Sequence, residues 1–135
     1  MKFLIDTNIL LEIILNQEKA NEARALLEKP EKFEFFLTDF SLHSIGILFF
    51  RTKKHHSFYQ FLNDMIFSEV LSIISLPYED MEKVIEASLR FNLDFDDAYQ
   101  YVVAEKHGLT IVSFDSDFDQ TDLGRKTPED VLYLY

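Results

Sequence analysis

Hydrophobic residues in this chain occur in two patterns that alternate along the sequence, short continuous runs and repeats at helical spacing. The continuous runs predict buried β-strands at residues 2–5, 33–37, 70–74 and 109–113. Apolar positions three and four residues apart predict the intervening helices, at residues 9–14, 16–28, 42–51, 58–66 and 81–89. Strands that alternate with helices imply a parallel sheet that is covered on both faces. The expected fold class is therefore α/β.

Turn and capping residues set the expected ends of two helices. Pro30 ends the helix over 16–28. Asp94 is a candidate N-cap for a further helix, because Asp97 stands three residues later in the position that closes a capping box. That helix is expected to stop at Gly108, a residue typical of helix C-termini.

The C-terminal segment is expected to complete the fold. Thr127 and Pro128 predict the start of a short turn or helix, and residues 131–135 predict an edge strand. The chain has 3 Gly and 3 Pro, and it contains no internal repeat, low-complexity tract or Gly/Ser linker. Residues 1–135 are therefore expected to form a single domain, which also suits the mass of 15.9 kDa.

Composition narrows the possible functions. A hydrophobic content of 47% with 14 Phe is enough for a substantial core, which argues against disorder. Lys and Arg total 13 against 24 Asp and Glu, so the net charge of −11 disfavours nucleic-acid binding through a broadly basic surface. It does not exclude an enzyme that meets a phosphate backbone through bound cations. The absence of Cys excludes a disulfide framework, a thiolate nucleophile and a Cys-based zinc site.

The N-terminal sequence reaches Asp6 after only a few apolar residues, so it does not predict a signal peptide. No apolar run approaches the ~18–20 residues needed to span a bilayer. We therefore expect a soluble, cytoplasmic protein that does not associate with a membrane.

Acidic residues follow two predicted strands at the edge where parallel sheets place their sites. Asp6 follows the first strand, and Asp115 follows the last, with Asp117 extending the same loop. Asp97 lies in the first turn of the helix that leads into the last strand. Carboxylates that converge must protonate, stay apart or hold a cation. Oxygen ligands without Cys or paired His suit Mg²⁺ or Mn²⁺, which can activate water for attack on phosphorus.

Each of these acids also has a purely structural explanation. Asp97 can interact favourably with the positive end of its helix dipole, and Asp6 can be the N-cap of the first helix. Asp115 can be an ordinary turn residue. The joint convergence of three acids at strand ends favours the functional interpretation.

Three stretches of the sequence resemble PIN-domain proteins. The first is the strand that ends in Asp-Thr-Asn-Ile-Leu at residues 6–10, and the others are residues 93–98 and 109–118. The resemblance covers essentially the whole chain. It implies a three-layer α/β/α sandwich with a central parallel sheet. It also implies metal-dependent cleavage of RNA, often by the toxin of a VapC-type toxin–antitoxin pair, and a homodimer.

The resemblance implies a role for each matching residue. The family's first, third and fourth metal-binding acids match Asp6, Asp97 and Asp115, and Asp117 matches an auxiliary metal ligand. The supporting positions are Asn8, next to the first acid, and Ser113, where a small hydroxyl residue usually lies beside the site.

The second acid of the family pattern is missing. The usual Glu position is occupied by Ser44, and no acid lies between Asp39 and Asp64. Ser44 is expected to have a supporting role, because a serine can hold a water or bond a neighbouring carboxylate, but it brings no negative charge. Asp39 lies about one turn too early to replace it, and the neighbouring His43 suits a packed or solvent-facing helix residue. The site therefore has one formal negative charge fewer than usual, which lowers the expected metal affinity.

Two functions from different classes follow. The first is a Mg²⁺- or Mn²⁺-dependent endoribonuclease, in which Arg51, Lys53 and Lys54 contact the RNA backbone; these cations equally suit the C-terminal end of a helix. The second is a degenerate PIN domain that binds a partner protein or RNA without cutting. A haloacid-dehalogenase or phosphoreceiver domain is set aside, because the acids that it needs after the first strand are absent.

Overall fold

A four-stranded parallel sheet forms the centre of the computed structural model, which describes residues 1–29 and 31–135. The strands lie in the order β3-β2-β1-β4. Residue Phe3 of β1 pairs with Phe35 of β2 on one side and with Thr110 of β4 on the other. The strand bounds are β1 Lys2–Ile5, β2 Glu34–Thr38, β3 Leu71–Ile74 and β4 Thr110–Val112.

Helices connect the strands and cover both faces of the sheet. Their bounds are α1 Thr7–Ile14, α2 Ala20–Leu27, α3 Asp39–Arg51, α4 His55–Phe61, α5 Met81–Phe91, α6 Phe95–His107 and α7 Pro128–Leu134. A π-helical segment, Leu62–Phe67, continues α4, so the helix predicted over 58–66 changes its hydrogen-bond pattern halfway. Short 3₁₀ turns occupy Tyr78–Asp80 and Ser116–Gln120.

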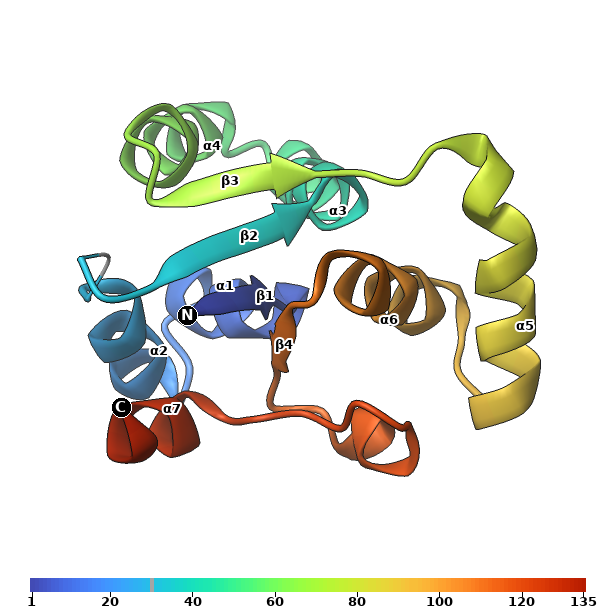
Figure 1. Cartoon of the computed structure of the whole chain (residues 1–135). Helices are drawn as coiled ribbons and strands as arrows, with labels where there is room; N and C mark the ends of the chain where they lie inside the picture. The colour runs from blue at the N-terminus through green and yellow to red at the C-terminus, as the bar shows by residue number, and fades with distance from the viewer. Residues whose placement is uncertain (30) are drawn as a thin grey trace.

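The core is divided by the sheet into two layers. Phe3 and Ile5 of β1 face a cluster formed with α1, α2, α3, α4 and α7, whereas Leu4 faces a cluster formed with α5 and α6. Figure 1 shows α5 and α6 together to the right of the strands. Because alternate residues of a strand point to opposite faces, both faces of β1 are apolar and buried. The predicted three-layer α/β/α sandwich with a central parallel sheet is confirmed.

Capping residues explain where several helices begin and end. Thr38 accepts a hydrogen bond from the Ser41 amide at 3.0 Å, so α3 begins at Asp39, three residues before its apolar repeat. Gly108 has a φ of +66° and ends α6 as predicted. Asn16 has a φ of +50° and closes α1, so α2 begins at Ala20 and not at residue 16. The predicted stop at Pro30 lies outside the described residues.

The C-terminal segment is a helix, and the edge strand predicted over 131–135 is wrong. Thr127 and Asp130 form a reciprocal capping box that starts α7, with Pro128 at its first position. Val131 is fully buried in the core cluster on the α1 side of the sheet. The last residue, Tyr135, lies 6.1 Å from Phe3 between ring centroids, so the C-terminus packs against β1. Local capping therefore outweighed the β-propensity of the segment.

No helix in the described residues is long and apolar enough to cross a membrane.

Replacing Thr127 by Ala removes the side chain that starts α7 and is expected to lower the free energy of unfolding by about 1 kcal/mol. Urea denaturation followed by circular dichroism measures this loss. Tyr133→Ala, on the exposed side of the same helix, is the matched control and should leave the midpoint nearly unchanged. An unchanged midpoint in Thr127→Ala would contradict the capping role.

Candidate functional site

The pairing of β1 with β4 brings Asp6 and Ser113 together at the carboxyl edge of the sheet. Ile5 pairs with Val112, so the residues that follow them leave the sheet side by side. The Ser113 hydroxyl donates to Asp6 Oδ2 at 2.6 Å, and both residues are buried. Asp6 is the N-cap residue of α1, as the structural explanation of this acid expects, but its carboxylate makes no capping hydrogen bond to the helix, so capping does not account for the side chain.

A second donor reaches Asp6 from α6. Gln100 Nε2 donates to Asp6 Oδ1 at 2.9 Å, so each carboxylate oxygen accepts one side-chain hydrogen bond. Burial raises the pKa of Asp6 above its usual range, whereas the hydrogen bonds from Ser113 and Gln100 act in the opposite direction. The loss of hydration outweighs these two donors, so the charged form of Asp6 is less favourable here than in water.

Asn8 and Ser113 organise the loop that follows β4. Asn8 Nδ2 donates to Ser113 Oγ at 3.2 Å, and Asn8 Oδ1 accepts from the Phe114 amide at 3.2 Å. Ser113 Oγ also accepts from the Asp115 amide at 2.9 Å. Asp115 Oδ1 in turn accepts from the Asp117 amide at 2.9 Å, which makes Asp115 the cap of a 3₁₀ turn. The turn explanation of Asp115 is therefore correct for one of its two carboxylate oxygens.

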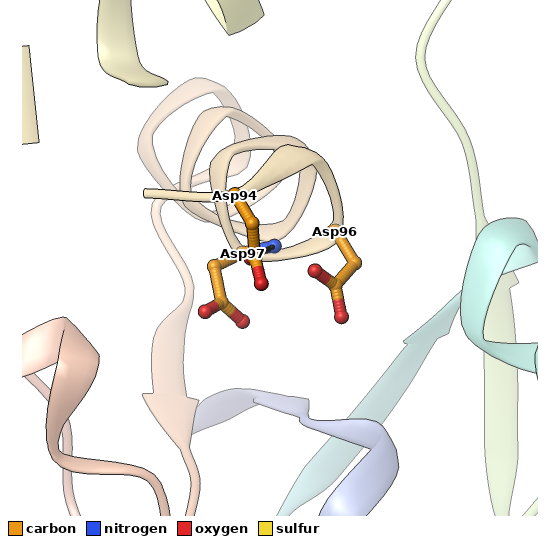
Figure 2. A group of neighbouring side chains, drawn as sticks. All are labelled: Asp94, Asp96 and Asp97. Carbon is orange, nitrogen blue, oxygen red and sulfur yellow. Dashed lines mark hydrogen bonds between the residues drawn. The ribbon is translucent and has the colours of Figure 1, made fainter. Parts of the chain in front are cut away.

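The remaining acids form two groups that share Asp97. Carboxylate oxygens of Asp97, Asp115 and Asp117 lie within 4.8 Å of one another, and so do those of Asp94, Asp96 and Asp97. Figure 2 shows the carboxyl groups of the second group projecting to the same side from the start of α6. Asp6 belongs to neither group, although its charge helps to raise the pKa of Asp97 and the charge of Asp115 helps to raise the pKa of Asp6. The structure thus brings all the predicted acids to one edge of the sheet.

Burial and mutual repulsion perturb these acids strongly. Burial, followed by the charges of Asp96, Asp94, Asp6 and Asp115, raises the pKa of Asp97 to about 8. Burial and the neighbouring Asp94 raise the pKa of Asp96 to about 6. The charge of Asp115 raises the pKa of Asp117. Without a cation, the raised pKa of Asp97 favours one proton on the cluster near neutral pH, and a bound cation would displace it.

The donor set fits a hard divalent cation. All the clustered ligand atoms are carboxylate oxygens, which suit Mg²⁺ or Mn²⁺. Asp94 accepts from the Asp97 amide at 3.4 Å and so caps α6, but among the described residues the Asp94 amide makes no reciprocal hydrogen bond to the Asp97 carboxylate. The Asp97 carboxylate is therefore not used in a capping box.

Helix α3, where the PIN-domain pattern has its second acid, contributes no carboxylate to either acidic group. Ser44 is half-buried on α3, one turn beyond Ser41. Asp39 Oδ1 accepts a hydrogen bond from the Tyr99 hydroxyl at 2.8 Å, and the same hydroxyl accepts one from the Leu76 amide at 2.9 Å. Asp39 thus holds α3 to α6. His43 is exposed, as a solvent-facing helix residue should be.

The predicted RNA-binding cations lie far from the acids. Arg51, Lys53 and Lys54 are exposed at the end of α3, whereas Asp39 at its start follows the site edge of β2. A helix of 13 residues is about 20 Å long. The structure therefore does not bring these cations together with Asp6 and its neighbours, and their contact with RNA stays a prediction.

Sequence reasoning missed two polar residues of α6 that contact the site's elements, Gln100 and Tyr99. Gln100 stands three residues after Asp97, so helical periodicity alone places it on nearly the same face. The available signal was a polar glutamine within an otherwise apolar and aromatic stretch, residues 98–104. Nothing in the sequence indicates which carboxylate it contacts, because Asp6 is far away along the chain.

Comparison with known proteins identifies the family. The PIN domain family model matches residues 3–123, so the chain belongs to the PIN domain family. A comparison with curated proteins gave no match.

Three solved structures share this fold. A toxin–antitoxin complex from Klebsiella pneumoniae has 19% identity and a TM-score of 0.72, covering 93% of this chain and 97% of its own. VapBC2 from Rickettsia felis, bound to a DNA fragment from its promoter, has 17% identity and a TM-score of 0.75, with the same coverage of 93% and 97%. FitAcB from Neisseria gonorrhoeae has 18% identity and a TM-score of 0.69, covering 96% of this chain and 99% of its own.

The raised pKa of Asp97 predicts how stability depends on pH in a metal-free protein. Between the unfolded value of 3.8 and the folded value of about 8, the folded state binds the extra proton. The contribution of Asp97 to the free energy of unfolding therefore falls as pH rises through this window and is constant above it. Urea denaturation in chelator at several pH values should show this slope as the difference between wild type and Asp97→Asn.

Glu129→Gln, which removes an exposed acid on α7, is the matched control and should parallel the wild type. A difference between wild type and Asp97→Asn that does not change with pH would contradict the raised pKa.

Proposed function

We propose that this PIN domain is a metal-dependent endoribonuclease that cleaves RNA phosphodiesters. One observation carries the proposal: Asp97, Asp115 and Asp117 place carboxylate oxygens within 4.8 Å of one another beside the buried Asp6. Such a cluster in an acidic chain is unfavourable without a cation. A divalent ion would relieve the repulsion and let a protein of net charge −11 approach a phosphate backbone.

Asp97, Asp115 and Asp117 would hold Mg²⁺ or Mn²⁺, with Asp6 beside them as a further acid of the site. A bound cation of this kind supplies Lewis-acid polarisation of a phosphoryl oxygen and lowers the pKa of water. The protein's own contribution is orientation. Ser113 and Gln100 fix Asp6, and Asn8 fixes the loop that carries Asp115.

A toxin role with a protein partner forms the second half of the proposal. The three solved structures named above share the fold, and the first is a toxin–antitoxin complex. We infer that this chain acts in the cytoplasm as the toxin of such a pair and forms a homodimer. A groove of about 310 Å³ between α1, the end of α3 and α4 offers apolar side chains to a partner, among them Ile14, Leu48 and Phe61.

One observation favours the alternative, a non-cutting binding module. Ser44 brings no charge to the position where the family pattern has its second acid, so the cation would be held by fewer carboxylates. A protein of this kind would still bind RNA or a partner protein. Purified wild-type protein that binds RNA with Mn²⁺ present and leaves it intact would establish the alternative.

RNA cleavage by purified protein with Mn²⁺ tests the enzyme directly. Asp6→Asn should reduce the cleavage rate more than about 100-fold. Loss of a residue that only hydrogen-bonds a metal ligand already lowers metal affinity or activity by about 10–100-fold. Glu129→Gln, which removes a remote exposed acid, should cleave like the wild type. Equal residual cleavage by wild type and Asp6→Asn would point to a contaminating nuclease and contradict the proposal.

Metal binding is tested separately by calorimetric titration with Mn²⁺. The wild type is expected to bind, and Asp97→Asn and Asp115→Asn should each weaken binding by at least about tenfold, because each removes one anionic ligand. Proton release measured in buffers of different ionisation enthalpy should accompany binding near neutral pH, since Asp97 carries a proton there. Wild-type protein that produces no binding heat and no proton release would exclude the metal site.

A further inference from the structure

Gln100 combines two features that rarely occur together in a buried side chain. It is 1% exposed on α6, and its Nε2 donates to Asp6 Oδ1 at 2.9 Å. Its Oε1 has no hydrogen-bond partner, and in the part of the chain that the structure describes it is the one buried side-chain nitrogen or oxygen of this kind. Buried polar atoms are normally paired, so the unpaired amide oxygen needs an explanation.

The location of this amide limits what can satisfy it. Nε2 and Oε1 are bonded to the same carbon of one planar amide group. Because Nε2 donates to Asp6, Oε1 must also lie close to the Asp6 carboxylate. Gln100 also stands one helical turn after Asp97 and so shares its side of α6. The unpaired acceptor therefore lies next to the carboxylates, and not in a remote part of the core.

Donation to Asp6 accounts for only one end of this amide. A Leu or Met here would remove the unpaired Oε1, but it would also remove the donor to Asp6 Oδ1, since Ser113 Oγ donates to the other oxygen, Oδ2. Holding Asp6 therefore explains Nε2 but does not explain Oε1. A ligand that donates hydrogen bonds, such as water, explains both ends of the amide.

We propose that Gln100 is a positioning residue of the metal site, which holds Asp6 through Nε2 and accepts a hydrogen bond from a water of the hydrated cation through Oε1. This inference rests on the proposed metal-dependent function. Divalent cations such as Mg²⁺ keep several waters when carboxylates bind them, and those waters need acceptors. A neutral amide supplies one without adding charge to acids whose repulsion is already large. It does so in a chain where Ser44 leaves the usual second acid missing.

Mn²⁺ titration of Gln100→Met tests this role, because Met keeps the length of the side chain and removes both polar ends. The Mn²⁺ dissociation constant should rise about 10–100-fold, as for other residues that hold a metal ligand in place by a hydrogen bond. Stability in chelator should fall by less than the Mn²⁺ affinity does, because the loss of the donor to Asp6 Oδ1 is partly offset by removal of the unpaired Oε1. Gln17→Met, the same change at an exposed position, is the matched control and should leave both values unchanged.

The outcomes separate this inference from the proposed function. A wild type that binds Mn²⁺ and a Gln100→Met variant that binds it equally well would overturn the role of Gln100 and leave the metal site intact. A variant that loses stability in chelator but keeps its Mn²⁺ affinity would show a purely structural role and also overturn it. A wild type that does not bind Mn²⁺ would overturn both proposals.

A crystal structure of the wild type with Mn²⁺ provides a second test that needs no variant. The expected result is a metal-bound water within hydrogen-bond distance of Gln100 Oε1, about 2.5–3.0 Å for an O–H···O bond. An Oε1 that accepts from a protein donor, or that faces only apolar atoms, would overturn the inference even if the cation is bound by the acids.

Discussion

The parallel pairing of β1 with β4 is the constraint on which the rest of the site depends. It sets Ile5 beside Val112, so the chain leaves both strands at one edge and Ser113 meets Asp6 at 2.6 Å. The connection into β4 runs through α6, which covers the same edge and carries Asp97. Residues from the two ends of the sequence are thus held within hydrogen-bonding distance by a backbone register that the buried core maintains.

Repulsion between the gathered carboxylates is the second constraint on this site. Two carboxylates about 5 Å apart repel by roughly 3 kcal/mol at an effective dielectric near 20. The fold nevertheless gathers several, and burial raises the pKa of Asp97 to about 8. Neutral donors moderate this repulsion locally: Ser113 and Gln100 hold Asp6, and backbone amides hold Asp115 and Asn8 in place. Two of the polar side chains in the core, Ser113 and Gln100, therefore serve to hold an acid.

Charge is distributed unevenly along α3, and this separates two regions of the molecule. Asp39, at the start of the helix, is used to anchor α3 to Tyr99 of α6. Lys54, just beyond its far end, lines the groove together with Leu48. The acids and the groove are thus different surfaces, joined by one helix, so the proposed chemistry and the proposed partner binding need not compete for the same side chains.

The sequence by itself determined the α/β class, the three layers and the placement of Asp6 and Asp115 after strands that end at one edge, because hydrophobic periodicity and the parallel topology that it implies are local or regular properties. Only the tertiary structure groups Asp97 and Asp115 with Asp117 and leaves Asp6 outside that group. The sequence was wrong about residues 131–135, where the capping box of Thr127 and Asp130 and the burial of Val131 select a helix. Only the tertiary structure decided that Gln100 contacts Asp6 and that Asp39 pairs with Tyr99. Each of these contacts joins residues distant in the chain, and side-chain partners across such distances depend on how the helices pack on the sheet, which no local pattern encodes.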